Sequence, residues 1–251
     1  MIGLALTKAK LNIKELAAQY RKNDFLNLAE ELIYKSNFKE FQLEDLAAPS
    51  GFSRGSIYSI FKTKDILIAM MAINAVEEMY NMVERSSNFK GSSRERLLAF
   101  HISQVLFMHI HPVAYHSIYT SGLMTDRSKL PENLLLEFDA GISRLVNILH
   151  HLIEEAVHCK ELTLPDYFSP AEYAENIWNG QYGTLATALN HKGDMSFYIN
   201  KYKKFMRVVA DSLPWHPTSS EVDYDVVTKR IIGEIFSNEY MAVKKANPSF
   251  I

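Results

Sequence analysis

The chain has 251 residues, of which 47% are hydrophobic and 22% are charged, and its formal net charge is −2. This length suits a small domain followed by a larger one, and the composition supplies enough apolar material for a core. The near-neutral charge argues against a general nucleic-acid binder, the single Cys159 excludes an intrachain disulfide, and no uninterrupted apolar run approaches the ~20 residues of a membrane span.

The N-terminus reads MIGLALTKAK, and its lysines interrupt the apolar residues too soon for a secretory signal. Together with the lone cysteine, this favours a reduced, cytoplasmic setting. Helical periodicity continues from residue 11 to residue 246, whereas strand-like alternation is short and scattered. We therefore expect an all-α protein of about nine or ten helices. Residues 1–66 would form a small module with a partly helical extension at 1–20, and residues 67–251 a larger helical bundle domain.

The first clear amphipathic pattern ends near Ser36, with Phe38 expected in the core just beyond it. Its apolar face comprises Phe25, Leu28, Ala29, Leu32 and Ile33. This spacing predicts a helix that shares its apolar face with the segment that follows.

Residues 42–67 predict two short helices joined by a tight turn. Leu43, Leu46 and Ala47 have the spacing of one buried helical stripe, and Gly51 can adopt the left-handed conformation that ends a helix. Ser53 is a good N-cap for the second helix. The buried side of that helix would comprise Ile57, Ile60 and Phe61, and its outward side Arg54, Ser56, Ser59 and Lys62. A small, polar, basic outward face of this kind suits the major groove of DNA.

The segment from Phe25 to Met70 resembles the N-terminal DNA-binding domain of the TetR family of bacterial regulators. The family's run Ala-Gly-Val-Ser-Lys-Gly-Thr-Leu-Tyr-x-Tyr-Phe corresponds to SGFSRGSIYSIF at residues 50–61, and Ser-Lys-Glu-x-Leu to TKDIL at residues 63–67. The match covers about a fifth of the chain. The chain departs from the family pattern at three places: Phe41-Gln42 stand where the family often has a helix-capping Thr, Pro49 replaces a helix former, and Ile60 replaces Tyr or His.

The resemblance implies a homodimeric transcriptional regulator, a repressor, which binds a palindromic operator in double-stranded DNA. Residues 1–66 would bind DNA, and residues 67–251 would bind a small-molecule effector and form the dimer. Arg54 would read the base edge of a guanine, while Tyr58, Lys62 and Lys64 would hold phosphates. The expected DNA-binding residues are Gln42, Ser53, Arg54, Gly55, Ser56, Tyr58, Ser59, Lys62 and Lys64. Residues 1–70 hold ten basic and eight acidic side chains, so DNA binding would depend on a local patch and on two copies acting together.

In the second domain we expect helices at about 64–85, 94–111, 132–158, 171–190, 195–213 and 221–245. Two glycines with two threonines form a small-residue face in the helix at 171–190, which suggests a close approach by another backbone. In the family this region pairs with its symmetry mate. The resemblance therefore assigns the dimer interface to Gly180, Gly183, Thr184, Thr187, Tyr202, Phe205 and Val209. The alternative is that these helices are core helices of a monomer.

Aromatic, methionine and polar side chains gather in the first half of this domain, as they do in ligand sites inside helical bundles. Ordinary core packing explains the same pattern, and only the resemblance favours an effector pocket. Its expected lining comprises Phe100, His101, Gln104, Phe107, Met108, Tyr115, Tyr119, Phe138, Trp178 and Tyr182.

No catalytic motif, cofactor motif or metal site is predicted. His150, Glu154 and His158 recur at four-residue spacing beside Cys159, which zinc would accept, but a solvated helix face explains them better. Two other hypotheses remain open. One is a helical small-molecule binder or enzyme with a purely structural helix-turn-helix, and the other is a regulator controlled by a protein partner.

Overall fold

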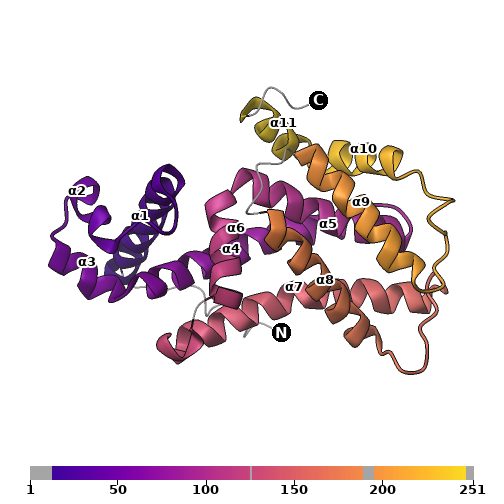
Figure 1. Ribbon diagram of the computed structural model, residues 1–251, viewed down its shortest axis with the longest axis horizontal. Coiled ribbons are helices and arrows are strands. Elements are labelled where there is room, and N and C mark those ends of the chain that lie inside the picture. The colour runs from indigo at the N-terminus through magenta and orange to yellow at the C-terminus, as the bar shows by residue number, and fades with distance from the viewer. Residues whose placement is uncertain (1–12, 125, 189–194, 247–251) are drawn as a thin grey trace. The chain divides into compact units, whose positions relative to one another are not determined.

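A computed structural model describes residues 13–124, 126–188 and 195–246 (Figure 1). Within these residues the protein has eleven α-helices, short 3₁₀ and π turns, and a single β-bridge between Leu162 and Trp215. The all-α prediction is confirmed. The chain divides into two compact units, Met1–Met71 and Ala72–Ile251, and the predicted boundary at residue 66 lies within helix α4 (Lys64–Ser86).

The first unit contains α1 (Ile13–Ser36), a 3₁₀ turn η1 (Leu43–Leu46), α2 (Ala47–Ser50), α3 (Arg54–Phe61) and the start of α4. Its helices share one apolar centre, as expected. The Phe25 ring packs edge-on against the rings of Phe61 and Phe52, with centroids 5.8 and 5.2 Å apart. Phe41 is fully buried whereas Phe38 is half-buried, so Phe41 is the core residue of the loop between α1 and η1.

The second predicted helix of this unit is a 3₁₀ turn followed by a single α-helical turn. Pro49 has no backbone N–H, so it cannot extend an α-helical ladder, and the helix ends at Ser50.

The second unit packs its helices around α5 (Ser93–Ile110) (Figure 1). All residues from 97 to 108 are buried, and α5 contacts α7 (Glu132–His158), α9 (Met195–Asp211) and the C-terminal helices. Pro112 starts α6 (Pro112–Tyr119) directly after α5 ends, and α8 (Pro170–Ala188) packs on α7. Among the described helices, only α4 is long and apolar enough to cross a membrane by itself, and 56% of that window is buried, as in a core helix.

The last predicted helix is two helices, α10 (Tyr224–Ile235) and α11 (Ser237–Ala246), which is why the described count exceeds ten. The break lies at Phe236, whose side chain is fully buried. The Arg85 guanidinium packs over the Phe236 ring at 5.3 Å, donates to the Ile235 carbonyl and pairs with Glu239. Burial of Phe236 and capping of the carbonyl by Arg85 favour two helices over one.

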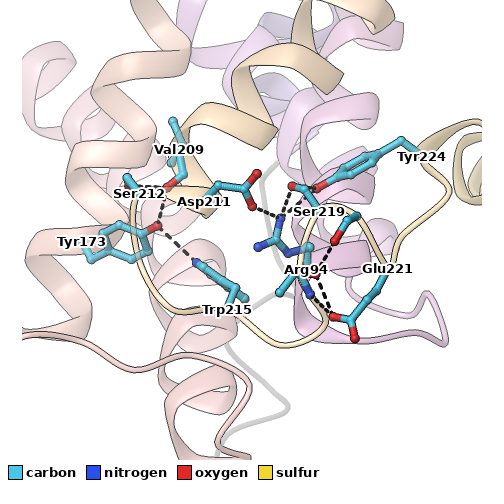
Figure 2. Close-up of polar contacts among 11 residues, drawn as sticks. Arg94, Tyr173, Val209, Asp211, Ser212, Trp215, Ser219, Glu221 and Tyr224 are labelled. Carbon is cyan, nitrogen blue, oxygen red and sulfur yellow. Dashed lines mark hydrogen bonds and ion pairs between the residues drawn. The ribbon is translucent and has the colours of Figure 1, made fainter.

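A buried arginine ties the segment 212–223, between α9 and α10, to the first turn of α5 (Figure 2). The Arg94 side chain is 1% exposed, and its Nη1 donates to Asp211 Oδ1 at 3.0 Å, Ser219 Oγ at 2.6 Å and Tyr224 Oη at 3.1 Å. The guanidinium also lies 5.8 Å from the centre of the Trp215 ring.

Candidate functional site

The turn of the helix-turn-helix has the backbone that its residues predict. Gly51 has φ 73° and ψ 9°, the left-handed conformation that glycine adopts without steric cost. Ser53 precedes α3, and its Oγ accepts a hydrogen bond from the Ser56 backbone N–H at 3.1 Å. Both predictions are confirmed, and together they fix where α3 begins.

The outward face of α3 presents few free polar groups. Arg54, Gly55, Ser59 and Lys62 are exposed, whereas Ile57 is fully buried. The Ser59 hydroxyl donates to the Ser56 carbonyl at 2.7 Å, and the Ser56 and Ser53 hydroxyls lie 2.9 Å apart. Each hydroxyl therefore already has a partner within its own helix or its cap, and the exposed cations of this face are Arg54 and Lys62.

Ile60 does not lie on the buried side of α3. Its side chain is 41% exposed, so the prediction that it belongs to the core is wrong. The buried stripe runs from Ile57 to Phe61 at i, i+4, which leaves position 60 at the edge of that stripe. Ile60 thus adds an exposed apolar group to α3, one helical turn after Ser56.

Tyr58 on α3 is tied to Glu44 in η1. The Tyr58 hydroxyl donates to Glu44 Oε1, and the ring remains 41% exposed. This hydrogen bond lowers the pKa of the Glu44 carboxyl and raises the pKa of the Tyr58 phenol. Glu44 was not among the residues predicted from sequence, and an isolated glutamate in a polar segment gives no signal that would identify it.

Lys64 has a structural role in this unit. Its Nζ donates to the backbone carbonyls of Phe38 and Phe41, the latter at 2.6 Å, and lies 5.8 Å from the Phe41 ring centre. Partial burial lowers the pKa of the Lys64 ammonium. Two of its three N–H donors are therefore committed to the loop between α1 and η1, which contradicts the expectation of a lysine that reaches out to a phosphate.

Replacing Lys64 by methionine is expected to destabilise the first unit by about 1–3 kcal/mol, because two carbonyls lose their charged donor. Hydrogen exchange of peptides from residues 25–71 measures this loss locally. Lys62→Met is the matched control at an exposed lysine, with an expected change of about 0.5 kcal/mol or less. Equal protection in the two variants would contradict the structural role of Lys64.

Gln42 lies at the start of η1 and is exposed. Its backbone N–H donates to Asp45 Oδ2 at 2.7 Å, so the turn is capped by Asp45 in place of the threonine that the family uses. The Gln42 amide makes one long contact, 3.5 Å, with the Glu40 carbonyl. The Gln42 amide is therefore exposed at the start of η1, where it can donate to a phosphate.

The predicted pocket residues form part of the core of the second unit. Phe100, His101, Gln104, Phe107 and Met108 are buried on α5, as are Tyr115, Phe138 and Trp178 on α6, α7 and α8, while Tyr119 is half-buried. The Tyr182 side chain lies outside the described residues. A polar contact crosses this core: the Gln104 and Gln181 amides exchange two hydrogen bonds, at 3.2 and 3.3 Å. Gln181 was not predicted as a site residue.

His101 is the most deeply buried titratable group among these residues. Its side chain is fully buried, and burial lowers the pKa of the imidazole to about 3, so the ring is neutral at physiological pH. A separate groove of about 460 Å³ lies between α4, α5 and α11. Its lining includes Met82, Phe107, Ile110, His111 and Ala242.

The predicted dimer residues divide into two groups. The side chains of Gly183, Thr184, Thr187 and Tyr202 lie outside the described residues. Phe205 and Val209 are half-buried and pack against the core of their own chain, and the Phe205 ring would lie 3.1 Å from a Cβ added at Gly180. The close neighbour of Gly180 is therefore α9 of the same chain, so packing within the chain accounts for a glycine at this position. The exposed large apolar side chains of α9 are Phe197 and Val208.

The histidines of α7 pair with a carboxylate. His150 Nε2 and His151 Nδ1 lie 3.3 and 3.1 Å from the two oxygens of Glu154, and the two rings stack. Within residues 13–124, 126–188 and 195–246, no group of three His, Cys, Asp or Glu side chains is arranged to hold a metal ion.

Residues 25–71 match the family described as bacterial regulatory proteins, tetR family. No curated protein matches the chain.

Three similar solved structures are transcriptional regulators. One, of the TetR family, from Agrobacterium tumefaciens, has 21% identity and a TM-score of 0.56, over 75% of this chain and 96% of that one. The TetR-family regulator PfmR from Thermus thermophilus has 13% identity and a TM-score of 0.55, over 72% and 96%. The ketosteroid transcriptional regulator KstR2 of Mycobacterium tuberculosis has 13% identity and a TM-score of 0.54, over 77% and 95%. At these identities the structures show a shared fold.

Proposed function

This chain is a member of the TetR family of bacterial regulatory proteins, with the family's DNA-binding domain at residues 25–71, and we propose that it is a homodimeric, cytoplasmic repressor of transcription that a small molecule releases from DNA. The observation that carries the proposal is the exposed face of α3. A capped helix that presents Arg54, Ser59 and Lys62 next to a left-handed glycine turn has the chemistry of a major-groove reader.

In this proposal Arg54 reads a base edge, since a guanidinium at the first position of the helix can bind guanine O6 and N7 together. Lys62 and Gln42 contact phosphates, while Tyr58 stays hydrogen-bonded to Glu44 beside them. Ser53, Gly55, Ser56 and Ser59 allow the helix to approach the groove closely. Lys64 supports this surface from within the fold. Lys62 is therefore the lysine that we propose as a phosphate contact.

Dimerisation is proposed through α8 and α9, with an apolar face that differs from the predicted one. Phe197 and Val208 are each more than half exposed, and Lys204, at the helical spacing between them, is also exposed. An exposed apolar pair on a long helix supports a two-fold interface, in which the same patch of each subunit meets its copy. Two α3 helices would then read two half-sites of a palindromic operator.

The effector is proposed to be small and largely apolar. The support comes from the buried aromatic residues of the predicted pocket, beside which lie the neutral polar side chains of His101, Gln104 and Gln181. A similar fold occurs in the ketosteroid transcriptional regulator KstR2 and in the fatty acid degradation regulator FadR from Bacillus halodurans. The effector can shift DNA binding only by its difference in affinity for the two states of the dimer.

A mobility-shift assay on the DNA that flanks the protein's own gene tests the proposal. We expect salt-dependent binding by the wild type and a loss of about tenfold to a hundredfold in affinity for Arg54→Ala, since a bidentate base contact contributes about 1–3 kcal/mol. Lys35→Ala, which removes an exposed cation from α1, is the matched control. Wild-type affinity in Arg54→Ala would contradict the assignment of α3, and no DNA binding at low salt would favour a small-molecule binder.

A further inference from the structure

A carboxylate belongs to the same surface as the proposed DNA contacts. Glu44 lies in η1, fourteen residues before Tyr58 and on the other side of the Gly51 turn, and its Oε1 accepts the Tyr58 hydroxyl. The bond joins the two halves of the helix-turn-helix through side chains. It also uses the one phenol of α3 as a donor to an acid of the same chain.

The Glu44 carboxyl carries a negative charge at neutral pH. The Tyr58 hydroxyl lowers its pKa most, and the positive charge of Arg54 lowers it further. Arg54 is therefore close enough to Glu44 for the two charges to interact. The proposed base reader and a fixed acid share one exposed surface.

This acid changes the charge balance of the surface substantially, because few cations oppose it. The exposed cations of α3 and its C-cap are Arg54 and Lys62, while the Lys64 ammonium donates to the Phe38 and Phe41 carbonyls. Binding to DNA of arbitrary sequence depends almost entirely on phosphate neutralisation. A carboxylate at this place opposes that attraction whatever the sequence.

Resting on the proposed DNA-binding function, we propose that Glu44 is a specificity-determining residue, which weakens the attraction of α3 to phosphates in general and holds Tyr58 in place. Tight binding then requires the base contact of Arg54, because the phosphate contacts alone are too few. In the operator complex that base contact, which DNA of arbitrary sequence does not offer, offsets the repulsion.

The test compares two DNA duplexes of equal length, one selected by the wild-type protein from a random-sequence library and one scrambled. Glu44→Gln removes the charge and retains an oxygen that can accept the Tyr58 hydroxyl. We expect its affinity for the scrambled duplex to rise about threefold to tenfold, with a dependence of log affinity on log salt steeper by about one unit. Affinity for the selected duplex should change by about twofold or less, so the ratio of the two affinities falls.

Two further variants separate charge from position. Glu31→Gln makes the same change in net charge on α1, outside the helix-turn-helix, and should leave the ratio unchanged. Tyr58→Phe removes the hydroxyl and keeps the carboxylate, so it should not raise affinity for the scrambled duplex. An unchanged ratio in Glu44→Gln, or a rise in Tyr58→Phe equal to that in Glu44→Gln, would overturn the role of Glu44 alone. Failure of the wild type to select any duplex would overturn the proposed function and this inference together.

Discussion

Asp211→Ala is expected to destabilise the second unit by about 2–4 kcal/mol. Arg94 is 1% exposed, and Asp211 is the carboxylate that pairs with it directly among the described residues, at 3.0 Å (Figure 2). Removing one partner of a buried pair leaves an uncompensated charge, which costs about 3–5 kcal/mol when both are buried. The expected loss is smaller here because Asp211 is 47% exposed and water screens the pair. Urea unfolding followed by tryptophan fluorescence measures it, since Trp178 and Trp215 both lie in this unit.

A double variant identifies the cause of that loss. Arg94→Met removes the buried charge and keeps a long side chain, so adding it to Asp211→Ala should recover most of the lost stability. Additive losses would mean that the contacts of Arg94 with Ser219 and Tyr224 matter more than its charge. Asp225→Ala removes a carboxylate that pairs with Lys203 on the surface and is 77% exposed, and it should cost about 1 kcal/mol or less.

Acidification from pH 7 to pH 5 is expected to lower the unfolding free energy of the second unit by about 2 kcal/mol through His101. Burial holds the folded pKa of His101 at about 3, against an ordinary value of 6.5. Between these values the unfolded chain binds a proton that the folded chain does not, so stability is present above pH 6.5 and is lost as the pH falls. His116 acts in the same direction, because burial lowers its pKa also.

His101→Gln should remove most of this pH-dependent loss of stability, and it keeps a polar side chain at position 101. The measurement is the difference between unfolding free energies at pH 7 and pH 5, so a change in stability common to both values does not affect it. This range lies above the ordinary pKa values of the carboxyl groups, so most of them stay ionised. His151→Gln, which replaces an exposed histidine of α7, should retain the full difference. The same difference in wild type and His101→Gln would show that His101 does not carry the effect.

Local rules were sufficient for the helix-turn-helix and failed where side chains act over a distance. The left-handed Gly51 and the Ser53 cap depend on neighbours within three residues, and both were predictable from the sequence. Lys64 reaches back 23 and 26 residues to its carbonyl partners. Helical periodicity predicts only which face of its helix carries Lys64. The position of the loop that Lys64 contacts depends on the burial of Phe41 in the core of the first unit.

In the second unit the sequence predicted the apolar helices, but it did not identify which stripe of α9 is buried most deeply. Phe205 and Val209 lie on one stripe of α9, but the fully buried stripe is Met206 and Ala210, one residue away. A helix with apolar residues at both positions has two candidate faces, and only the packing partners choose between them. The break at Phe236 likewise has no glycine or proline at the break itself, and the ends of the two helices are held by Arg85, some 150 residues earlier.

The contacts of Arg94 also bear on the order in which the chain folds as it is synthesised. Its partners Asp211, Ser219 and Tyr224 follow it by 117, 125 and 130 residues. At about 5–20 residues per second, the ribosome delivers the first of them roughly 6 to 23 seconds after Arg94. Throughout that interval the guanidinium must remain hydrated, because a bare charge in an apolar core is too costly. The first turn of α5 therefore closes late, and the second unit completes its core only as its last third emerges.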